Sequence, residues 1–467
     1  MEKKERGSFK GSIGFILAAA GSAVGLGNIW RFPYLAARDG GGLFLLIYLL
    51  LAVTFGFTLL TSEVGIGRKT KQSPLTAYKK LSEKWGWIGF FSCLVPFLIL
   101  PYYCVIGGWV LKYFIAFATG GGARAAEKGY FGAFITGHVE PVLYMLIFLL
   151  VCAFIIFKGV NAGIERSSRV LMPVLLVMVI AVAIYSLTIT HVSDDGTVTT
   201  GMDGLGVYLV PSFKGLTVKK FFIIVTDALG QLFFSLSIAM GIMIAYGSYV
   251  PDDADLVKSV NRIEFFDTAV AFIAGVMIIP SVYAFNGLEG LEASGPSLIF
   301  ESLPKIFTQM GAVGNVVGAV FFAMVLFAAI TSAMSILEAV VSSFIDKYDM
   351  TREKATIAET VFCAVIALIV CFGYNFFYFE TTLPNGSKGQ ILDILDYLTN
   401  YIFMPVISIA TCILIGWVLK PKTITDELKK NGEKFGREGL YVVMVRFIAP
   451  VFIMILFLMS LGVIKLS

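Results

Sequence analysis

Polar residues interrupt an apolar segment near the start of the chain. Residues 20–34 read AGSAVGLGNIWRFPY, so three glycines, a serine, Asn28 and Arg31 stand inside a run long enough to cross a membrane. Bilayer hydrocarbon cannot hydrogen-bond freed backbone groups, so irregular chain at that depth persists only where it lines a site enclosed by protein. Loose carbonyls and amides at such a break hold ions and charged substrates in secondary transporters. Close helix packing on Gly21 and Gly25 is the alternative, and it leaves Asn28 and Arg31 unexplained.

A second apolar segment is interrupted in the same way. Residues 230–241 read GQLFFSLSIAMG and place glycines and serines in the middle of a possible span, five spans after the first break. Two interrupted segments at matching positions of two halves indicate an inverted repeat with a binding site between the halves. Because each half holds an odd number of spans, the halves have opposite orientations in the membrane.

The composition requires a membrane environment. The 467 residues are 57% hydrophobic and 15% charged, too little charge to cover the surface of a water-soluble protein of this size. We therefore predict an all-α integral membrane protein, one domain over residues 1–467, with eleven transmembrane helices and a 5+5 inverted repeat. Runs of the length that spans a bilayer recur at residues 11–37, 41–67, 88–119, 141–158, 168–190, 218–249, 260–286, 313–345, 355–375, 391–419 and 440–464. The first repeat covers residues 11–190, the second covers 218–419, and 440–464 form an additional helix.

Basic residues predict the orientation of the chain. Lysines and arginines gather in the N-terminal stretch and in residues 68–84 and 420–437, whereas opposite loops carry acids such as Asp194 and Asp195. By the positive-inside rule the N-terminus is cytoplasmic, and an odd number of spans leaves the C-terminus outside. We expect a multi-pass protein of the cell inner (plasma) membrane. The net charge of +4 reflects this orientation and does not support nucleic acid binding.

Other classes of function find no support in the sequence. The six cysteines fall in or beside apolar segments without paired spacing, which predicts buried thiols and makes disulfides improbable. His138 and His191 lie far apart, so a histidine metal site has no basis. There is no phosphate-binding glycine loop of an ATP-driven pump, and no nucleophile, base or metal constellation of an enzyme. A channel needs a continuous polar path, and no segment shows a polar stripe on that scale.

These features together closely resemble the neurotransmitter:sodium symporter family, from Arg6 to the tenth segment. The motif AGSAVGLGNIWRFPYL is long and specific to that family. The resemblance implies the leucine-transporter fold, in which helices 1–5 and 6–10 are inverted repeats and helices 1 and 6 are unwound. It also implies two sodium sites.

The second sodium site implied by the resemblance is uncharged. Its ligands would be the carbonyls of Gly21, Val24 and Ala328 and the hydroxyls of Thr331 and Ser332. Sodium prefers oxygen ligands, which unwound carbonyls and short hydroxyls supply. The alternative for the two hydroxyls is bonding back to their own helix.

The first sodium site departs from the family. It would use the Ala23 carbonyl, Asn28, Ser235, the substrate carboxylate and Asp267, where the family usually has asparagine. Many animal members need chloride to balance two sodium ions, and chloride-independent bacterial members carry a glutamate at the position of Ala271. Asp267 would then supply that negative charge, so chloride is not expected to be required. A structurally paired carboxylate is the alternative.

Three further polar residues support the site in the family. Tyr48 and Gln231, with Ser235, match the residues that line the chloride site and remain in this chain. Glu63 matches a glutamate that accepts hydrogen bonds from amides freed by the break in helix 6. We expect Glu63 to support the site without binding an ion.

The resemblance implies an amino acid substrate. Monoamine members carry aspartate where this chain has Gly25, so the ligand is expected to bring its own carboxylate. That carboxylate would meet sodium, the amides of Leu26 and Gly27, and the Tyr103 hydroxyl. The amine would meet the carbonyls of Ala23 and Phe234 and the hydroxyl of Ser237. An uncharged pocket of Ile99, Phe234, Met240, Ser332 and Ile336 suits an apolar or aromatic side chain.

Ion pairs are expected to close the two sides. Arg31 and Asp396 would form the external gate through a bridging water, with Phe234 and Tyr103 as an inner lid, and residues 294–311 would plug the vestibule as an external loop. On the cytoplasmic side, Arg6 and Asp346 would pair. Exposed pairs contribute only ~0–1 kcal/mol, so they can break in every cycle.

The leading hypothesis is therefore sodium-coupled symport of hydrophobic or aromatic L-amino acids by alternating access. The expected partners are Na+, the amino acid and the lipid bilayer. Two alternatives stay open: the same fold working by proton counter-transport or exchange through Asp267, and a substrate-sensing membrane receptor.

Overall fold

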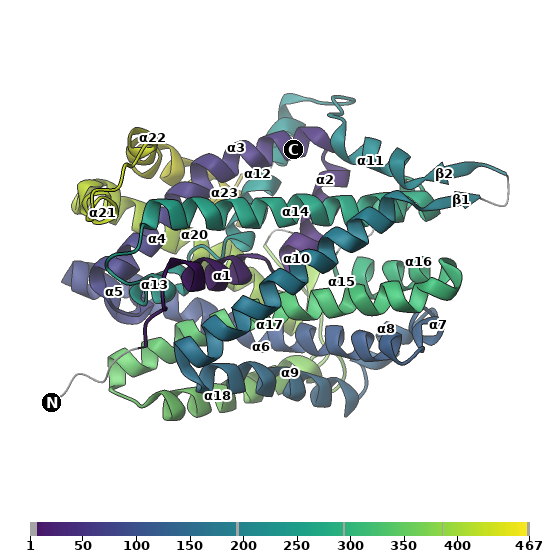
Figure 1. Ribbon diagram of the computed structural model, residues 1–467, viewed down its shortest axis with the longest axis horizontal. Helices are drawn as coiled ribbons and strands as arrows, with labels where there is room; N and C mark the ends of the chain where they lie inside the picture. Colours follow the sequence, from purple (N-terminus) through teal and green to yellow (C-terminus); the bar gives the residue numbers. More distant parts are fainter. Residues whose placement is uncertain (1–6, 193–195, 293–294, 385, 465–467) are drawn as a thin grey trace.

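Long apolar helices form the body of the molecule and run along its longest axis (Figure 1). The computed structural model describes residues 7–192, 196–292, 295–384 and 386–464. Within these residues, nine helices are long and apolar enough to cross a membrane, and one bent pair makes a tenth. The nine are Gly42–Thr70, Glu83–Ala118, Glu140–Phe157, Val160–Leu187, Leu256–Asn286, Gly311–Tyr348, Arg352–Phe372, Ile391–Val418 and Glu438–Ser460.

These spans are built from shorter elements, several of them joined through a π-helical turn. In the first half they are α3 (Gly42–Leu51), η2 (Ala52–Gly56), α4 (Phe57–Thr70), η3 (Glu83–Trp85), α6 (Gly86–Ala118), α9 (Glu140–Phe157), η4 (Val160–Glu165) and α10 (Arg166–Leu187). In the second half they are α14 (Leu256–Asn286), η7 (Gly311–Val313), α17 (Gly314–Tyr348), α18 (Arg352–Phe372), α19 (Ile391–Asp396), η8 (Tyr397–Phe403), α20 (Met404–Ile413), η9 (Leu414–Val418), α22 (Glu438–Val443), η10 (Met444–Ile448) and α23 (Ala449–Ser460).

The tenth span is the first interrupted segment. Helix α1 (Ser12–Ala23) ends where the Val24 amide donates to the Ala20 carbonyl, and the chain resumes in η1 (Gly27–Arg31) and α2 (Phe32–Arg38) at an angle of 54°. The Asn28 side chain accepts the Gly25 N–H at 3.2 Å and so satisfies one amide that the break frees. The predicted interruption is therefore present in the structure.

The second interrupted segment, predicted at residues 218–249, consists of α12 (Val218–Ser235) and α13 (Ile242–Ser248). Between them the chain is not helical, and Ser237, Ala239 and Gly241 adopt positive φ values of 53°, 63° and 69°. Helix α12 carries two lysines and an aspartate, so it is less apolar than the ten spans counted above. A count of eleven transmembrane helices stays a prediction.

The connections depart from a purely helical protein. Strands β1 (Thr190–Val192) and β2 (Val198–Thr200) pair antiparallel, as do β3 (Thr381–Thr382) and β4 (Lys388–Gly389), so two short hairpins accompany an otherwise helical structure. Within the predicted external loop, residues 294–311, the chain forms the short helices α15 (Gly295–Ser297), η6 (Leu298–Ser302) and α16 (Leu303–Gln309). The remaining short helices are α5 (Pro74–Leu81), α7 (Gly122–Ala125), α8 (Tyr130–Ile135), α11 (Gly201–Leu209), η5 (Glu289–Glu292) and α21 (Lys422–Leu428).

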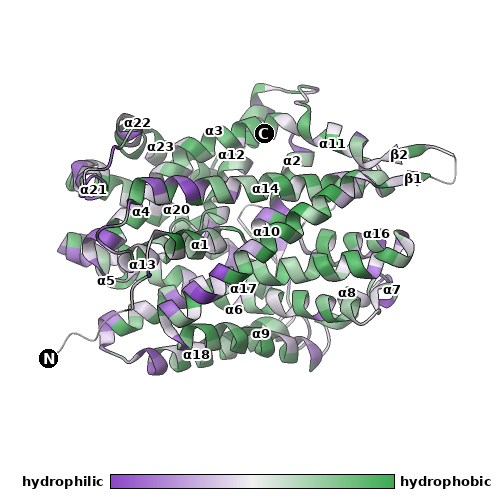
Figure 2. Ribbon diagram, in the orientation of Figure 1, coloured by the Kyte–Doolittle hydropathy of each residue, from purple (hydrophilic) through white to green (hydrophobic). Residues whose placement is uncertain are grey.

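Helix α1 lies at the centre of the bundle, packed against α10, α14 and α17. Hydrophilic residues collect toward the ends of the molecule, most clearly at the end with α5 and α21, and the body between is mainly hydrophobic (Figure 2). The breaks that follow α1 and α12 lie inside protein, as broken helices in a bilayer require.

All six cysteines are buried and free.

Candidate functional site

The two breaks and α14 bring three polar side chains together. Asn28 Nδ2 donates to Ser235 Oγ at 3.1 Å and to Asp267 Oδ1 at 2.8 Å. Ser235 Oγ also donates to Asp267 Oδ1 at 2.6 Å. All three residues are fully buried or nearly so. A carboxylate held by an amide and a hydroxyl at a broken helix can offer oxygen to a cation.

Unsatisfied polar atoms surround this group. Asp267 Oδ2, the Tyr48 hydroxyl and Gln231 Oε1 are buried and make no hydrogen bond in the described part of the chain. The Tyr48 hydroxyl faces Ser235 and Asp267, and Gln231 Nε2 donates to the Gly27 carbonyl at 3.1 Å. Buried polar groups normally have a hydrogen-bond partner, so three buried polar atoms without one in the same region fit a site that receives an ion.

Glu63 lies beneath the second break. Its Oε1 accepts the N–H of Ala239 at 2.6 Å, and Ala239 is one of the residues with positive φ in that break. The Glu63 carboxylate therefore satisfies a backbone amide that the interruption of the helix frees. Its other oxygen has no partner among the described residues.

Two of the residues expected at the second sodium site, Gly21 and Thr331, lie close together between α1 and α17. A Cβ atom placed on Gly21 would lie 3.3 Å from the Cβ of Thr331. The Thr331 hydroxyl donates to the carbonyls of Phe327 and Ala328, each at 3.0 Å, which is the back-bonding that the sequence left open. A hydroxyl that donates one hydrogen bond keeps its lone pairs, so Thr331 Oγ1 can still ligate a cation.

Sequence reasoning did not assign a role to Ser22. Its carbonyl accepts hydrogen bonds from Ser332 Oγ at 3.1 Å and Ser237 Oγ at 3.3 Å, and its hydroxyl lies 3.3 Å from Ser237 Oγ. Ser22 thus joins both broken helices to α17. The position of Ser22 inside the motif of the first break was the one feature of the sequence that could have indicated this role.

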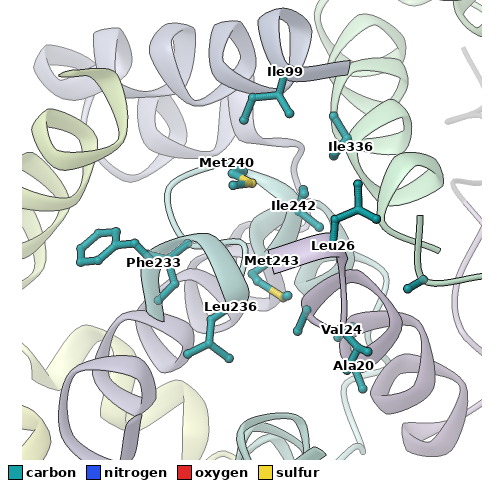
Figure 3. Packing of buried hydrophobic residues seen from close by; sticks show 14 of the residues in the cluster. Ala20, Val24, Leu26, Ile99, Phe233, Leu236, Met240, Ile242, Met243 and Ile336 are labelled. Carbon is teal, nitrogen blue, oxygen red and sulfur yellow. The ribbon is translucent and has the colours of Figure 1, made fainter. Parts of the chain in front are cut away.

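A small cavity of about 20 Å³ lies between the two breaks. Every predicted substrate-binding residue except Ser235 lines it, together with Ser22, Gly25 and Asn28. The predicted residues are Ala23, Leu26, Gly27, Ile99, Tyr103, Phe234, Ser237, Met240, Ser332 and Ile336. Figure 3 shows that Leu26, Ile99, Met240 and Ile336 come from separate segments around this region. Most of these side chains are apolar, so the cavity suits an apolar ligand with polar groups at its broken-helix end.

Gly25 leaves no room for a side chain at this cavity. A Cβ atom there would lie 2.9 Å from Ser332 Oγ and 3.4 Å from the Tyr103 hydroxyl. The Tyr103 hydroxyl is buried and unpartnered among the described residues. It is therefore available to a ligand.

Phe234 separates the small cavity from a larger one. The larger cavity, of about 240 Å³, is lined by Arg31, Phe234, Asn400 and Met404 among others. Phe234 lines both cavities. Its ring is therefore the wall between them.

The structure describes three of the four expected gate residues, Arg31, Asp346 and Asp396. Arg31 and Asp396 make no direct ion pair, and Asp396 Oδ1 instead accepts from Tyr102 at 3.2 Å and from Asn400 Nδ2 at 2.6 Å. Arg6 lies outside the described residues. Its expected partner Asp346 accepts the Ser73 N–H at 2.6 Å.

Comparison with known proteins extends this description. Residues 6–121 and 135–466 match the model of the Sodium:neurotransmitter symporter family. The chain is 32% identical to an uncharacterized sodium-dependent transporter of Bacillus subtilis, with all of both chains covered. It is 24% identical to the human sodium- and chloride-dependent GABA transporter 2, over 92% of this chain and 77% of that protein. The crystal structure of MhsT in complex with L-phenylalanine is 34% identical, with a TM-score of 0.84 over 98% of this chain and 100% of that one.

Proposed function

This chain belongs to the sodium:neurotransmitter symporter family, and from that premise we propose that it couples sodium entry to the uptake of hydrophobic or aromatic L-amino acids by alternating access. The family consists of membrane transporters that depend on sodium, not of enzymes. The substrate class, the ion sites and the conformational cycle are parts of our proposal.

The observation that carries the proposal is the contact between Asn28, Ser235 and Asp267 beside an apolar cavity. Ser235 and Asp267 offer oxygen atoms at the point where the two broken helices meet, and Asn28 holds both through its Nδ2. A sodium ion there would attract the carboxylate of a zwitterionic ligand. The rest of the ligand would lie among Ile99, Met240 and their apolar neighbours.

Gly25 supports the assignment to amino acids. Glycine has no side chain, so no acidic group is present there to bind an amine alone, and an added Cβ atom would lie only 2.9 Å from Ser332 Oγ. The related MhsT was crystallised with L-phenylalanine. We extend that ligand class, an aromatic amino acid, to this chain.

We propose two sodium ions per cycle and no requirement for chloride. The first ion would use the Ala23 carbonyl, Asn28, Ser235 and Asp267, and the carboxylate of Asp267 would supply the charge that chloride supplies elsewhere. The second would use the carbonyls of Gly21, Val24 and Ala328 and the hydroxyls of Thr331 and Ser332. The N-terminus would be cytoplasmic and the C-terminus outside.

A panel of radiolabelled amino acids in proteoliposomes tests this proposal. Uptake of phenylalanine, tyrosine, tryptophan and leucine should require an inward sodium gradient, and collapse of the gradient should abolish accumulation. Equal uptake in potassium alone would contradict it.

Proton counter-transport is the second candidate, and the free oxygen of Asp267 favours it. Asp267 Oδ2 has no hydrogen-bond partner among the described residues, so a proton can occupy it when sodium leaves. An uptake signal driven by an outward proton gradient at constant sodium would support this candidate.

A further inference from the structure

A groove on the outer surface of the bundle lies apart from the transport site. It has a volume of about 470 Å³ and runs where α9, η4 and α10 meet α17. Its walls are apolar along most of its length and include Val151, Phe154, Ile155, Val170, Leu171 and Ile330. Phe154 and Val170 are 61% and 60% exposed, so in a membrane they face lipid.

Two cations lie at one end of the groove. Lys158 follows the last residue of α9, and Arg166 is the first residue of α10. The Lys158 ammonium lies 4.2 Å from the centre of the Phe154 ring, a cation–π distance that holds it over the groove. Ser167 adds a hydroxyl to the same lining. This end of α9 points toward the end of the molecule that carries α5 and the N-terminus (Figure 1).

Among the described residues, no acidic side chain neutralises the charge of this end. No carboxylate in the described ranges lies within 4 Å of Lys158 or Arg166, and no acidic residue lines the groove. The neighbouring Arg169 differs, because it pairs with Glu165 at 2.6 Å. Two unpaired cations at the end of a membrane-spanning helix pair lie at the level of lipid headgroups.

We propose that the groove binds an anionic glycerophospholipid of the cytoplasmic leaflet. One acyl chain lies along Phe154, Val170 and Ile330, and the headgroup phosphate lies between Lys158 and Arg166. The apolar length selects a lipid over a free phosphate, and the two cations select an anionic lipid over a zwitterionic one. A basic residue near an anionic surface contributes about fivefold to binding, so the pair contributes about 25-fold.

Native mass spectrometry of the delipidated full chain tests the proposal. Phosphatidylglycerol and phosphatidylcholine with identical acyl chains are titrated against the wild type and against Lys158→Gln/Arg166→Gln. The wild type should bind one phosphatidylglycerol at least tenfold more tightly than phosphatidylcholine, and the variant should lose that preference. Arg124→Gln/Lys128→Gln is the matched control, because it removes the same two charges from an exposed segment at the other end of the bundle.

Two further experiments distinguish a bound lipid from free phosphate. Ala162→Trp fills the groove without a change of charge and should weaken both lipids at this site. Glycerol 1-phosphate should not displace phosphatidylglycerol; displacement would mean that the cations bind free phosphate. A preference for phosphatidylglycerol that survives in Lys158→Gln/Arg166→Gln, or that is lost equally in the control, would overturn the assignment.

Discussion

The ring of Phe234 lies directly against Gly27, so that the two broken helices touch where both residues line the small cavity. A Cβ atom on Gly27 would lie 2.5 Å from Cδ1 of Phe234, closer than real Cβ contacts allow. The contact requires glycine at position 27. It also fixes the ring as the wall between the small cavity and the larger one.

Gly27→Ala should therefore weaken substrate binding. The added methyl group pushes the Phe234 ring away, and we expect the apparent KM for the best substrate to rise about tenfold, which corresponds to ~1.4 kcal/mol. Uptake kinetics in proteoliposomes measure this. Gly206→Ala is the control, since nothing lies within 4 Å of its Cβ position. Gly27→Ala/Phe234→Leu should recover part of the loss, and an unchanged KM in Gly27→Ala would refute the steric role.

Thr331→Val with Ser332→Ala should abolish sodium-dependent uptake. The double variant removes the Thr331 hydroxyl near Gly21 and the Ser332 hydroxyl near Gly25 at nearly constant volume, so the proposed second sodium ion would lose two ligands. Thr360→Val is matched to the threonine change, because Thr360 bonds back to the Thr356 carbonyl in the same way on α18. Uptake against sodium concentration should fall to background in the first variant only. If the double variant transported at the wild-type rate without sodium, these two residues would not belong to the ion site.

Ten of the predicted spans and both breaks could be predicted because they depend on local sequence. Apolar length sets the spans, and glycines with polar residues inside apolar runs mark the interruptions near Gly25 and Ser237. The role of Ser22 could not be predicted, since it depends on hydrogen bonds to residues 215 and 310 positions away. Asp396 shows the same limit: its partner Tyr102 lies on α6, and only tertiary packing brings them together.

Compounds should compete for the transport site only if they carry a carboxylate. Phenylalanine, tyrosine and tryptophan should compete strongly with the labelled substrate, whereas glutamate, lysine and tyramine should compete poorly. Tyramine lacks the carboxylate that would partner sodium near Asn28, and a charged side chain would be buried among Ile99 and Ile336 without a partner. Inhibition constants for tyrosine and tyramine decide this. Equal inhibition by the two would rule out the carboxylate contact.

A surface network on one end of the molecule should give a small, acid-sensitive contribution to stability. Asp252 pairs with Lys71 at 2.9 Å and with Lys430 at 3.1 Å. Its hydrogen bonds to these lysines lower the pKa of the Asp252 carboxyl below its usual 3.8. The stabilisation is therefore present above pH 3.8 and is lost as the pH falls through the lowered value.

Asp252→Asn should lower the unfolding midpoint by a similar small amount at pH 8 and pH 5, because the carboxylate is ionised at both. The pair is exposed, so the effect should stay within ~0–1 kcal/mol and shrink in high salt. Thermal unfolding in detergent at the two pH values and two salt concentrations measures it. If the difference in unfolding midpoint between the wild type and Asp252→Asn grew from pH 8 to pH 5, the lowered pKa of Asp252 would be contradicted.

Asp267 should decide the response to chloride. In the proposed cycle, two sodium ions and a zwitterion would bring net positive charge into a buried site, and the Asp267 carboxylate would offset part of that charge. Asp267→Asn removes the charge but keeps the shape, and the hydroxyl of Tyr48 and the amide of Gln231 remain beside it as polar groups for an anion. We expect wild-type uptake to be equal in chloride and gluconate, and the variant to be slow in gluconate and stimulated several-fold by chloride. Glu264→Gln is the control on the same helix, because Glu264 already pairs with Arg437. Strong chloride dependence of the wild type, or a variant equally active in both anions, would show that Asp267 does not take the place of chloride.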